Sequence, residues 1–300
     1  MATVNTIGNV TQENGIFYDK VLLKRLVGNL HFAKYGQKRN ISKHNGTQID
    51  MRRFNSLSPV TEPLTEGVTP DGKEFTVTNV RATVKEMGDY VVVSDMLDMA
   101  GLDPVITEMA EVLGEQAAES IDNVIKEEIF AGTTVQYAGG ASGRGSVTAV
   151  LTGDEIMKAV RTLRNNKAKP VADGYYIGFI DPYCAYDLMK DPLWQDVSKY
   201  SNKENIEKGE IGKLHGVRFV DNTNAFVVDN VHGTLIIGQD AYGLVDIEGS
   251  RKPKIIIKTA KEGGAADPLE QRNSIGWKAV FTAKRLQELA MVRIESGVTA

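Results

Sequence analysis

Residues 173–222 read DGYYIGFIDPYCAYDLMKDPLWQDVSKYSNKENIEKGEIGKLHGVRFVDN and hold the clearest local signals of this 300-residue chain. The apolar run at 175–180 predicts a buried strand, and Asp181-Pro182 predicts a helix start, because proline suits the first helical turn. A second Asp-Pro pair precedes Trp194, and the segment 209–220 predicts a return to extended structure. The stretch contains no catalytic motif, so it informs the fold rather than a reaction.

The most regular helix is predicted over 103–130. Asp103 is a suitable N-cap, Pro104 suits the first helical position, and Gly132 predicts the end. Apolar residues recur at intervals of three and four, which predicts one buried face. The opposite face is acidic and carries Asp103, Glu108, Glu111, Glu115, Glu119, Asp122, Glu127 and Glu128.

A long β-hairpin is predicted before this helix. Two arms at 57–69 and 74–85 flank Thr69-Pro70-Asp71-Gly72, whose Pro and Gly positions are typical of a type I turn. The first arm has few large apolar residues, and an isolated hairpin is only marginally stable in water. The hairpin therefore needs a partner surface, which another subunit could supply. Residues 90–93 then predict a buried strand.

The segment 19–53 is basic. Nine Lys and Arg residues stand against Asp19 and Asp50, a charge of +7, so the rest of the chain carries −11 and the total is −4. The nine are Lys20, Lys24, Arg25, Lys34, Lys38, Arg39, Lys43, Arg52 and Arg53. Residues 17–32 also predict an amphipathic helix suited to docking. We expect an arm that binds a negative surface, for which the acidic helix is one candidate, with a solvated arm as the alternative.

The remaining sequence predicts both helices and strands. Thr152 and Glu155 have the spacing of a capping box before a helix that runs to about Asn165, and the glycine-rich residues 138–146 predict a flexible connection. Short β-branched or alternating segments predict strands at 217–220, 235–237, 255–257, 277–281 and 291–295. Because helices and strands do not alternate regularly, the pattern favours an α+β fold over a doubly wound sheet.

Composition excludes several classes of protein. Apolar residues make up 42% of the chain, yet no run approaches the roughly 18 that a membrane span needs. The N-terminus lacks the pattern of a signal peptide. A net charge of −4 and a pI near 5.7 argue against a free-standing nucleic-acid-binding protein. The single Cys184 excludes an internal disulfide and fits a reducing cytoplasm.

Cys184 is the one candidate nucleophile, with His215 or His232 as its base. A lone cysteine is more often a small core residue than a catalyst. We therefore expect Cys184 to be buried and no catalytic residue to be present.

No cofactor or metal site is predicted either. The four histidines lack the spacing of a zinc motif, and the glycines at 139–145 lack the ending of a phosphate-binding loop. Those at 209, 212 and 216 are interpreted as turn or close-approach positions rather than a dinucleotide motif. Asp181 and Asp191 are interpreted as helix caps rather than an acid/base pair.

Four blocks of the sequence, taken in order, resemble the major capsid proteins of tailed bacteriophages. They are the Thr/Val-rich segment 57–93, the acidic helix, the block GFIDP…DPLW…GEIGKLHGVRFV, and the ending DPLEQRNSIGWKAVFTAKRLQELAMVRIE at 267–295. The resemblance covers about residues 40–295 and implies the Hong Kong 97-like fold.

The resemblance implies a division of the chain into five parts. Residues 1–55 would be an N-terminal arm, and 56–95 an extended hairpin loop that lies over a neighbouring subunit. Residues 96–149 would form a peripheral domain with a spine helix, 150–250 an axial domain, and 251–300 a return to the peripheral domain.

The function implied by the resemblance is structural, with no enzymatic activity and no cofactor. Copies would self-assemble as hexamers and pentamers, in the host cytoplasm, into an icosahedral virion shell around double-stranded DNA. Scaffolding, portal and decoration proteins are further expected partners, whereas no membrane contact is expected. Expected interface residues are Lys24, Arg25, Arg39, Arg52, Arg53, Pro70, Asp71, Gly72, Lys73, Glu111, Glu115 and Glu119.

Three alternatives remain open at this point. The first is an encapsulin-like protein compartment of the same fold, loaded with protein cargo. The second is a cytoplasmic enzyme that uses Cys184. The third is a binding protein that forms only small closed oligomers.

Overall fold

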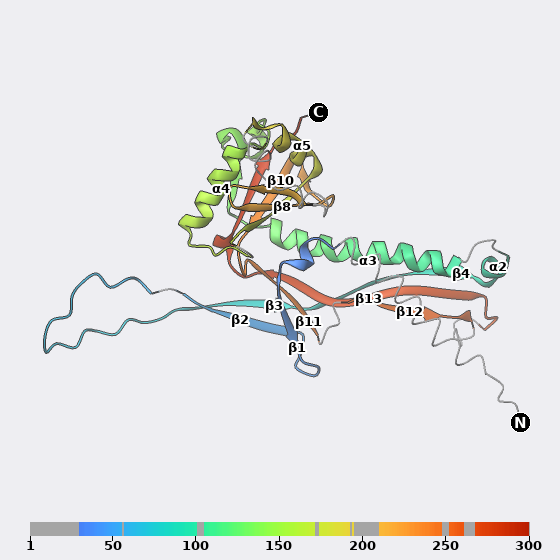
Figure 1. Ribbon diagram of the computed structural model, residues 1–300. Helices are drawn as coiled ribbons and strands as arrows, with labels where there is room; N and C mark the ends of the chain where they lie inside the picture. Colours follow the sequence, from blue (N-terminus) through green and yellow to red (C-terminus); the bar gives the residue numbers. More distant parts are fainter. Residues whose placement is uncertain are drawn as a thin grey trace, which may run out of the picture.

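A computed structural model describes residues 30–55, 57–100, 105–171, 174–192, 194, 210–247, 252–260 and 268–299. Figure 1 shows an elongated lower layer of long strands under a helix, and a rounder upper lobe of mixed strands and helices. A thin loop projects from one end of the lower layer, opposite the end that carries α2 (Asp95–Ala100). The expected helix at 17–32 lies before the described part of the chain except for residues 30–32, where η1 (Phe32–Lys34) begins, and the basic residues Lys20, Lys24 and Arg25 also lie before it.

The lower layer is a five-stranded sheet in the order β1-β11-β13-β12, with β4 paired to β13. Its strands are β1 (Gln37–Ile41), β4 (Lys85–Ser94), β11 (Tyr242–Ile247), β12 (Lys254–Lys258) and β13 (Arg272–Arg285). Along β13, Ile275, Trp277, Ala279 and Phe281 alternate with more exposed residues and are buried, which is the period of a half-covered sheet. One face of the sheet is therefore covered and the other is open.

Helix α3 (Val105–Phe130) covers that face and runs along β4 and β13 (Figure 1). The Trp277 indole donates a hydrogen bond to Gln116 Oε1 at 3.1 Å, which fixes the helix to the sheet. The predicted helix is confirmed over this range, whereas its proposed N-cap lies outside the described residues. Val112 fits the predicted apolar spacing of this helix, but it is 52% exposed, so the sequence pattern places this one position wrongly.

The upper lobe contains a seven-stranded mixed sheet in the order β5-β14-β10-β6-β8-β7, with β9 paired to β10. Its strands are β5 (Val135–Tyr137), β6 (Tyr176–Ile180), β7 (Glu210–Leu214), β8 (Val217–Asp221), β9 (Phe226–Val228), β10 (Val231–Ile237) and β14 (Met291–Ser296). Helices α4 (Gly153–Asn165) and α5 (Pro182–Lys190) pack on it (Figure 1). The α+β prediction is confirmed, together with each strand predicted from 175 onward.

Short 3₁₀ helices connect these elements: η1 (Phe32–Lys34), η2 (Ala138–Gly140), η3 (Arg144–Ser146) and η7 (Glu288–Ala290). The predicted flexible connection at 138–146 is thus partly ordered as η2 and η3. No described helix has both the length and the apolar character needed to cross a membrane.

The hairpin differs from its prediction. Its strands are β2 (Gln48–Phe54) and β3 (Val77–Thr83), and residues 57–76 between them form a long loop without a strand. The first predicted arm contains Pro59 and Pro63, which lack the amide hydrogen that strand pairing requires. The turn forms at Thr65–Val68, where the Val68 amide donates to Thr65 O, rather than at 69–72.

Two further interpretations were wrong at the level of single side chains. Thr152 is the N-cap of α4 but makes no capping hydrogen bond, and Glu155 instead accepts from Gln136 and the Gly139 amide. The 90–93 strand exists within β4, but only Val93 is buried, whereas Tyr90 is 68% exposed.

Phe32 connects the two layers. Its ring is fully buried and lies 4.7 Å from the Phe179 ring of β6 and 6.1 Å from the Phe130 ring of α3. Its carbonyl accepts a hydrogen bond from the Tyr242 hydroxyl of β11, and its amide donates to Asp122 of α3 at 3.3 Å. Asp122, predicted to lie on the solvated acidic face, is thus buried, and that burial raises the pKa of its carboxyl.

Replacing Phe32 tests this junction. We expect Phe32→Ala to lower the free energy of unfolding of the isolated subunit by about 3–5 kcal/mol, because the removed ring leaves a cavity. The matched control is Phe54→Ala, whose side chain is 68% exposed, and which should change that free energy by no more than about 0.5 kcal/mol. Denaturant unfolding followed by circular dichroism measures both, and equal effects would contradict the role given to Phe32.

Candidate functional site

The predicted basic residues meet at the base of the hairpin. Arg39 on β1 and Arg52 and Arg53 on β2 are exposed and line one hollow of about 470 Å³. Asp50 also lines this hollow but is held across the hairpin by Arg81, through hydrogen bonds of 2.7 and 2.8 Å. That bidentate contact lowers the pKa of the Asp50 carboxyl. The three arginines outnumber Asp50 and Asp240, the acidic residues that line the hollow, so its surface is cationic. Lys24 and Arg25 lie outside the described residues.

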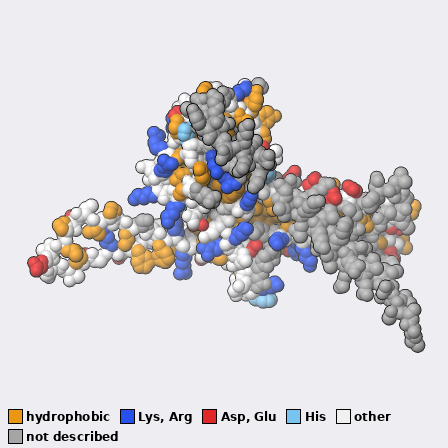
Figure 2. All heavy atoms as spheres, viewed as in Figure 1, with side chains coloured by type: hydrophobic (Ala, Val, Ile, Leu, Met, Phe, Trp, Pro, Cys, Tyr) orange, Lys and Arg blue, Asp and Glu red, His pale blue; other side chains and the backbone are white. Residues whose placement is uncertain are grey.

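The predicted turn residues lie in the projecting loop. Pro70, Asp71, Gly72 and Lys73 are all exposed, and Lys73 Nζ donates to Ser58 O at 3.1 Å across the loop. Large apolar side chains are exposed on and beside the loop: Phe54, Leu57, Val60, Leu64, Val68, Phe75 and Val77. Figure 2 shows these apolar atoms along the projection and acidic side chains at its tip. A contiguous exposed apolar surface of this kind is typical of an interaction site.

The predicted acidic residues lie on α3. Glu119 is exposed, and Glu111 and Glu115 are partly buried. Among the described residues, Arg39, Arg52 and Arg53, the loop residues and the α3 glutamates therefore lie on separate elements. The residue before η1 contacts α3: the His31 amide donates a hydrogen bond to Asp122 Oδ2 at 2.9 Å.

A groove on the open face of the lower sheet was missed by the sequence analysis. It has a volume of about 540 Å³ and lies across β4, β12 and β13. Tyr90 and Ile256 supply exposed apolar surface, and Lys258 and Lys278 supply positive charge. Gly276 lies among the lining residues, and a Cβ there would lie 2.8 Å from the Tyr90 Cβ, so this glycine lets β4 and β13 approach closely. The alternation along β13 could have shown which residues face away from α3, but not that they form a groove.

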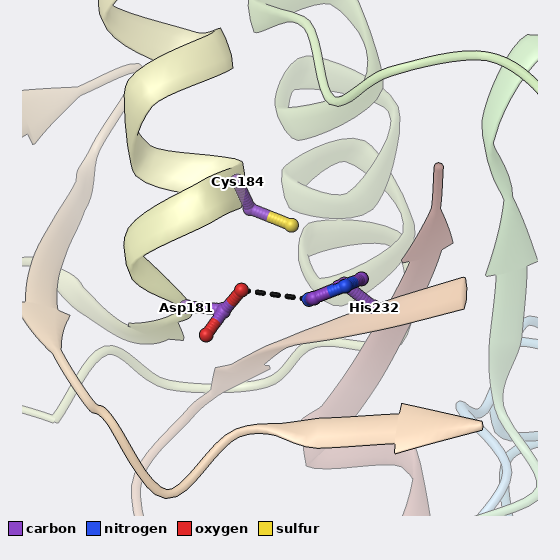
Figure 3. A group of neighbouring side chains, drawn as sticks. All are labelled: Asp181, Cys184 and His232. Atoms are coloured by element: carbon purple, nitrogen blue, oxygen red, sulfur yellow. Dashed lines mark hydrogen bonds and ion pairs between the residues drawn. The ribbon is translucent and has the colours of Figure 1, made fainter. Parts of the chain in front are cut away.

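Cys184 lies in a buried polar cluster with Asp181 and His232, shown in Figure 3. Asp181 and Cys184 come from the start of α5 and His232 from β10, and Asp181 Oδ2 lies 2.7 Å from His232 Nδ1. Asp181 has the backbone conformation of an N-cap but makes no side-chain cap, so its predicted role is only half right. Asp191 does cap a helix, although not its own: its carboxylate accepts from the Gly153 amide of α4 at 2.7 Å.

The set of side chains, one cysteine, one histidine and one aspartate, resembles a catalytic triad. The environment of the Cys184 sulfur, however, does not suit a nucleophile. Cys184 is fully buried, and that burial raises the pKa of its thiol to about 11. A nucleophilic cysteine needs the opposite, a lowered pKa and access to solvent. The prediction that Cys184 is buried is confirmed. His215, the other candidate base, lies away from this cluster in the turn between β7 and β8.

The other glycine predictions are confirmed where they are described. Gly216 has φ +85°, which allows the tight turn between β7 and β8. Gly212 has φ +145°, and a Cβ there would lie 2.9 Å from the Trp194 ring, so it permits a close approach. Gly209 lies outside the described residues.

An elongated subunit with a coreless apolar loop, a cationic hollow and an open groove is a structural protein that associates through its surfaces. The sequence model described as "Phage capsid protein" matches residues 77–294. The chain therefore belongs to the phage capsid protein family. It is a major capsid protein, a structural subunit of the virion head, and not an enzyme.

Solved structures show the same fold. The capsid of Ralstonia phage GP4 is 12% identical, with a TM-score of 0.70 over 91% of this chain and 92% of that one. The capsid of cyanophage P-SCSP1u is 14% identical, with a TM-score of 0.67 over 90% and 89%. The virus-like particle from Pyrococcus furiosus is 11% identical, with a TM-score of 0.57 over 94% and 99%. Among curated proteins, no match was found.

Thiol labelling tests the burial of Cys184. We expect a disulfide reagent near pH 8 to leave the native protein unmodified and to label one thiol per chain after denaturation, because Cys184 is the only cysteine. Absorbance of the released chromophore measures the rate of labelling in the native and in the denatured protein. Rapid labelling of the native subunit would contradict a sealed thiol.

Proposed function

We propose that copies of this chain build the icosahedral head by placing the projecting loop, residues 57–76, in the open-face groove of a second copy. The observation that carries this proposal is the row of exposed apolar side chains on a loop that has no core of its own. The loop leaves the subunit at the end opposite α2, away from its own groove (Figure 1). Only another copy can therefore bring loop and groove together.

Charge and polarity support the pairing. The loop carries four carboxylates, Glu62, Glu66, Asp71 and Glu74, against Lys73 alone. The groove offers Lys258 and Lys278 beside exposed Tyr90 and Ile256. Glu86 and Asp89 also line it, but Glu86 pairs with Lys278 and Asp89 accepts from Gln116, so Lys258 supplies the charge that would meet the loop. Burying one large apolar side chain contributes about 1.5–3 kcal/mol, so several of them make a modest contact that symmetry then repeats.

The cationic hollow is the second surface of the proposal. Arg39, Arg52 and Arg53 would meet carboxylates of another copy, and the α3 residues Glu111, Glu115 and Glu119 are the acidic surface that sequence analysis singled out. In this arrangement residues 1–55 act as the arm, 56–95 as the extended loop region and 96–149 as the peripheral domain. Residues 150–250 act as the axial domain except for β11, which lies in the lower sheet, and 251–300 return to the peripheral domain except for β14, which lies in the upper sheet.

We also propose that the shell encloses double-stranded DNA, with the basic segment at 19–53 facing either the DNA or a neighbouring subunit. The fold is shared with a virus-like particle from Pyrococcus furiosus, so a cargo-filled compartment is the second candidate. Purified particles that protect DNA from nuclease support the first candidate, and DNA-free particles that retain host protein support the second. Scaffolding, portal and decoration proteins are further proposed partners.

Deleting the loop tests the main contact. We expect a chain in which residues 57–75 are replaced by a short Gly-Ser linker to remain soluble and folded, because β2 and β3 still pair, but to form no closed shells. Light scattering and negative-stain electron microscopy measure assembly, with the full-length chain and its assembly partners as the control. Closed shells of normal size from the deletion variant would overturn the assignment of the loop.

Charge reversal in the groove is a finer test. Lys258→Glu places a carboxylate opposite the acidic loop, so we expect shell yield to fall at least about tenfold, the effect of losing roughly 1.4 kcal/mol. Lys169→Glu is the matched control, because Lys169 is an exposed lysine of the upper lobe outside the groove. A combined Lys258→Glu and Glu66→Lys chain should regain yield if loop and groove meet. If Lys258→Glu and the control Lys169→Glu lower the shell yield equally, the contact between loop and groove is refuted.

A further inference from the structure

The chain topology brings three metal-ligating side chains to one point in the upper lobe. Asp181 and Cys184 are one helical turn apart at the start of α5, so both face the sheet on the same side. On β10, Leu235 pairs with Phe179 of β6, so His232 comes opposite the start of α5. One ligand atom from each of the three side chains lies within 4.8 Å of the others.

The surroundings of the cluster are polar as well. Thr234 lies two residues from His232 and therefore on the same face of β10, and Ser296 of β14 is the register partner of His232. Ser296 Oγ lies 3.5 Å from the Cys184 sulfur. Thr234 Oγ1 is fully buried, faces that sulfur and makes no hydrogen bond of ordinary geometry. A buried hydroxyl without a partner costs free energy, which a ligand at this point would remove.

The cluster contains acidic groups whose partners are an imidazole and hydrogen-bond donors rather than a permanent positive charge. Asp181 is 6% exposed, and among the described residues its only ion-pair partner is His232. Asp187 is a second buried carboxylate on the same helix, and it is bonded to Thr299. In the part of the chain that the structure describes, no ion pair joins a lysine or arginine to these groups, whereas a divalent cation would stabilise a carboxylate and a thiolate together.

We propose that Asp181 Oδ, Cys184 Sγ and His232 bind a zinc ion in the upper lobe, with the Thr234 hydroxyl or a water as fourth ligand. One sulfur, one imidazole nitrogen and one carboxylate oxygen suit zinc, whereas calcium and magnesium prefer oxygen alone. Two ligands of a tetrahedral zinc lie roughly 3.3 Å apart, so the 2.7 Å contact between Asp181 and His232 opens slightly on binding. The ion would tie α5 to β10 and so stabilise the lobe rather than catalyse a reaction.

Cobalt substitution tests the site directly. Metal-free protein titrated with Co²⁺ should develop a near-ultraviolet thiolate-to-cobalt charge-transfer band and the visible bands of tetrahedral cobalt. Cys184 is the only cysteine, so a charge-transfer band reports this residue and no other. We expect the band to disappear on addition of Zn²⁺ and to be absent from Cys184→Ser. If the wild-type chain develops no such band, the cluster is a hydrogen-bonded core and the proposal fails.

Metal content gives a second, independent readout. Full-length protein purified without chelator should hold about one zinc per chain by elemental analysis, since the site has one ligand set. His232→Asn should lose it, while His215→Asn, a matched change at an αL turn position away from the cluster, should retain it. Circular dichroism checks that each variant is folded. Equal zinc content in wild type and folded His232→Asn would overturn the assignment.

Discussion

The two layers of the subunit are held together at one aromatic residue. Phe32 enters the space where β6, α3 and β11 approach one another, and each of these elements supplies a contact to its ring or its backbone. The Asp122 carboxylate accepts hydrogen bonds from the backbone amides of His31 and Phe32, so these two donors are satisfied where the chain enters the space. Because the upper sheet and the long helix meet through this residue, the orientation of the lobe over the lower layer depends on it.

The rest of the subunit is organised around what this core leaves uncovered. Helix α3 covers one face of the lower sheet, and the opposite face keeps Tyr90, Val92 and Ile256 exposed. The loop between β2 and β3 adds a second apolar surface at the far end of the molecule. A monomer that folds independently but leaves two such surfaces far apart suits association by repetition, in which modest contacts gain strength through number and symmetry.

Regular elements were predictable because their signals are local. The strand at 176–180, the helix that follows it and the period of α3 depend on neighbours within one or two turns. The first strand of the hairpin ends before the predicted arm because Pro59 and Pro63 lack the amide hydrogens that strand pairing requires. Side-chain partners were not predictable at all: His232 meets Asp181 across 51 positions, and Asp122 meets the Phe32 amide across 90. Spacing along the chain carries no information on such pairs, and the groove depends on which sheet face the helix covers.

The prolines of the loop have a consequence for how subunits recognise one another. A two-stranded ribbon such as β2–β3 has free edges, and a free edge is a template on which identical chains stack into fibrils. Pro59, Pro63 and Pro70 lie in the loop beyond that ribbon and lack amide donors, so the loop itself cannot pair with a neighbouring chain as a continuous strand. Recognition is left to side chains, whose contacts form and break more readily than a continuous ladder. A subunit added in the wrong place can therefore leave again, and a growing shell corrects its own errors instead of trapping them.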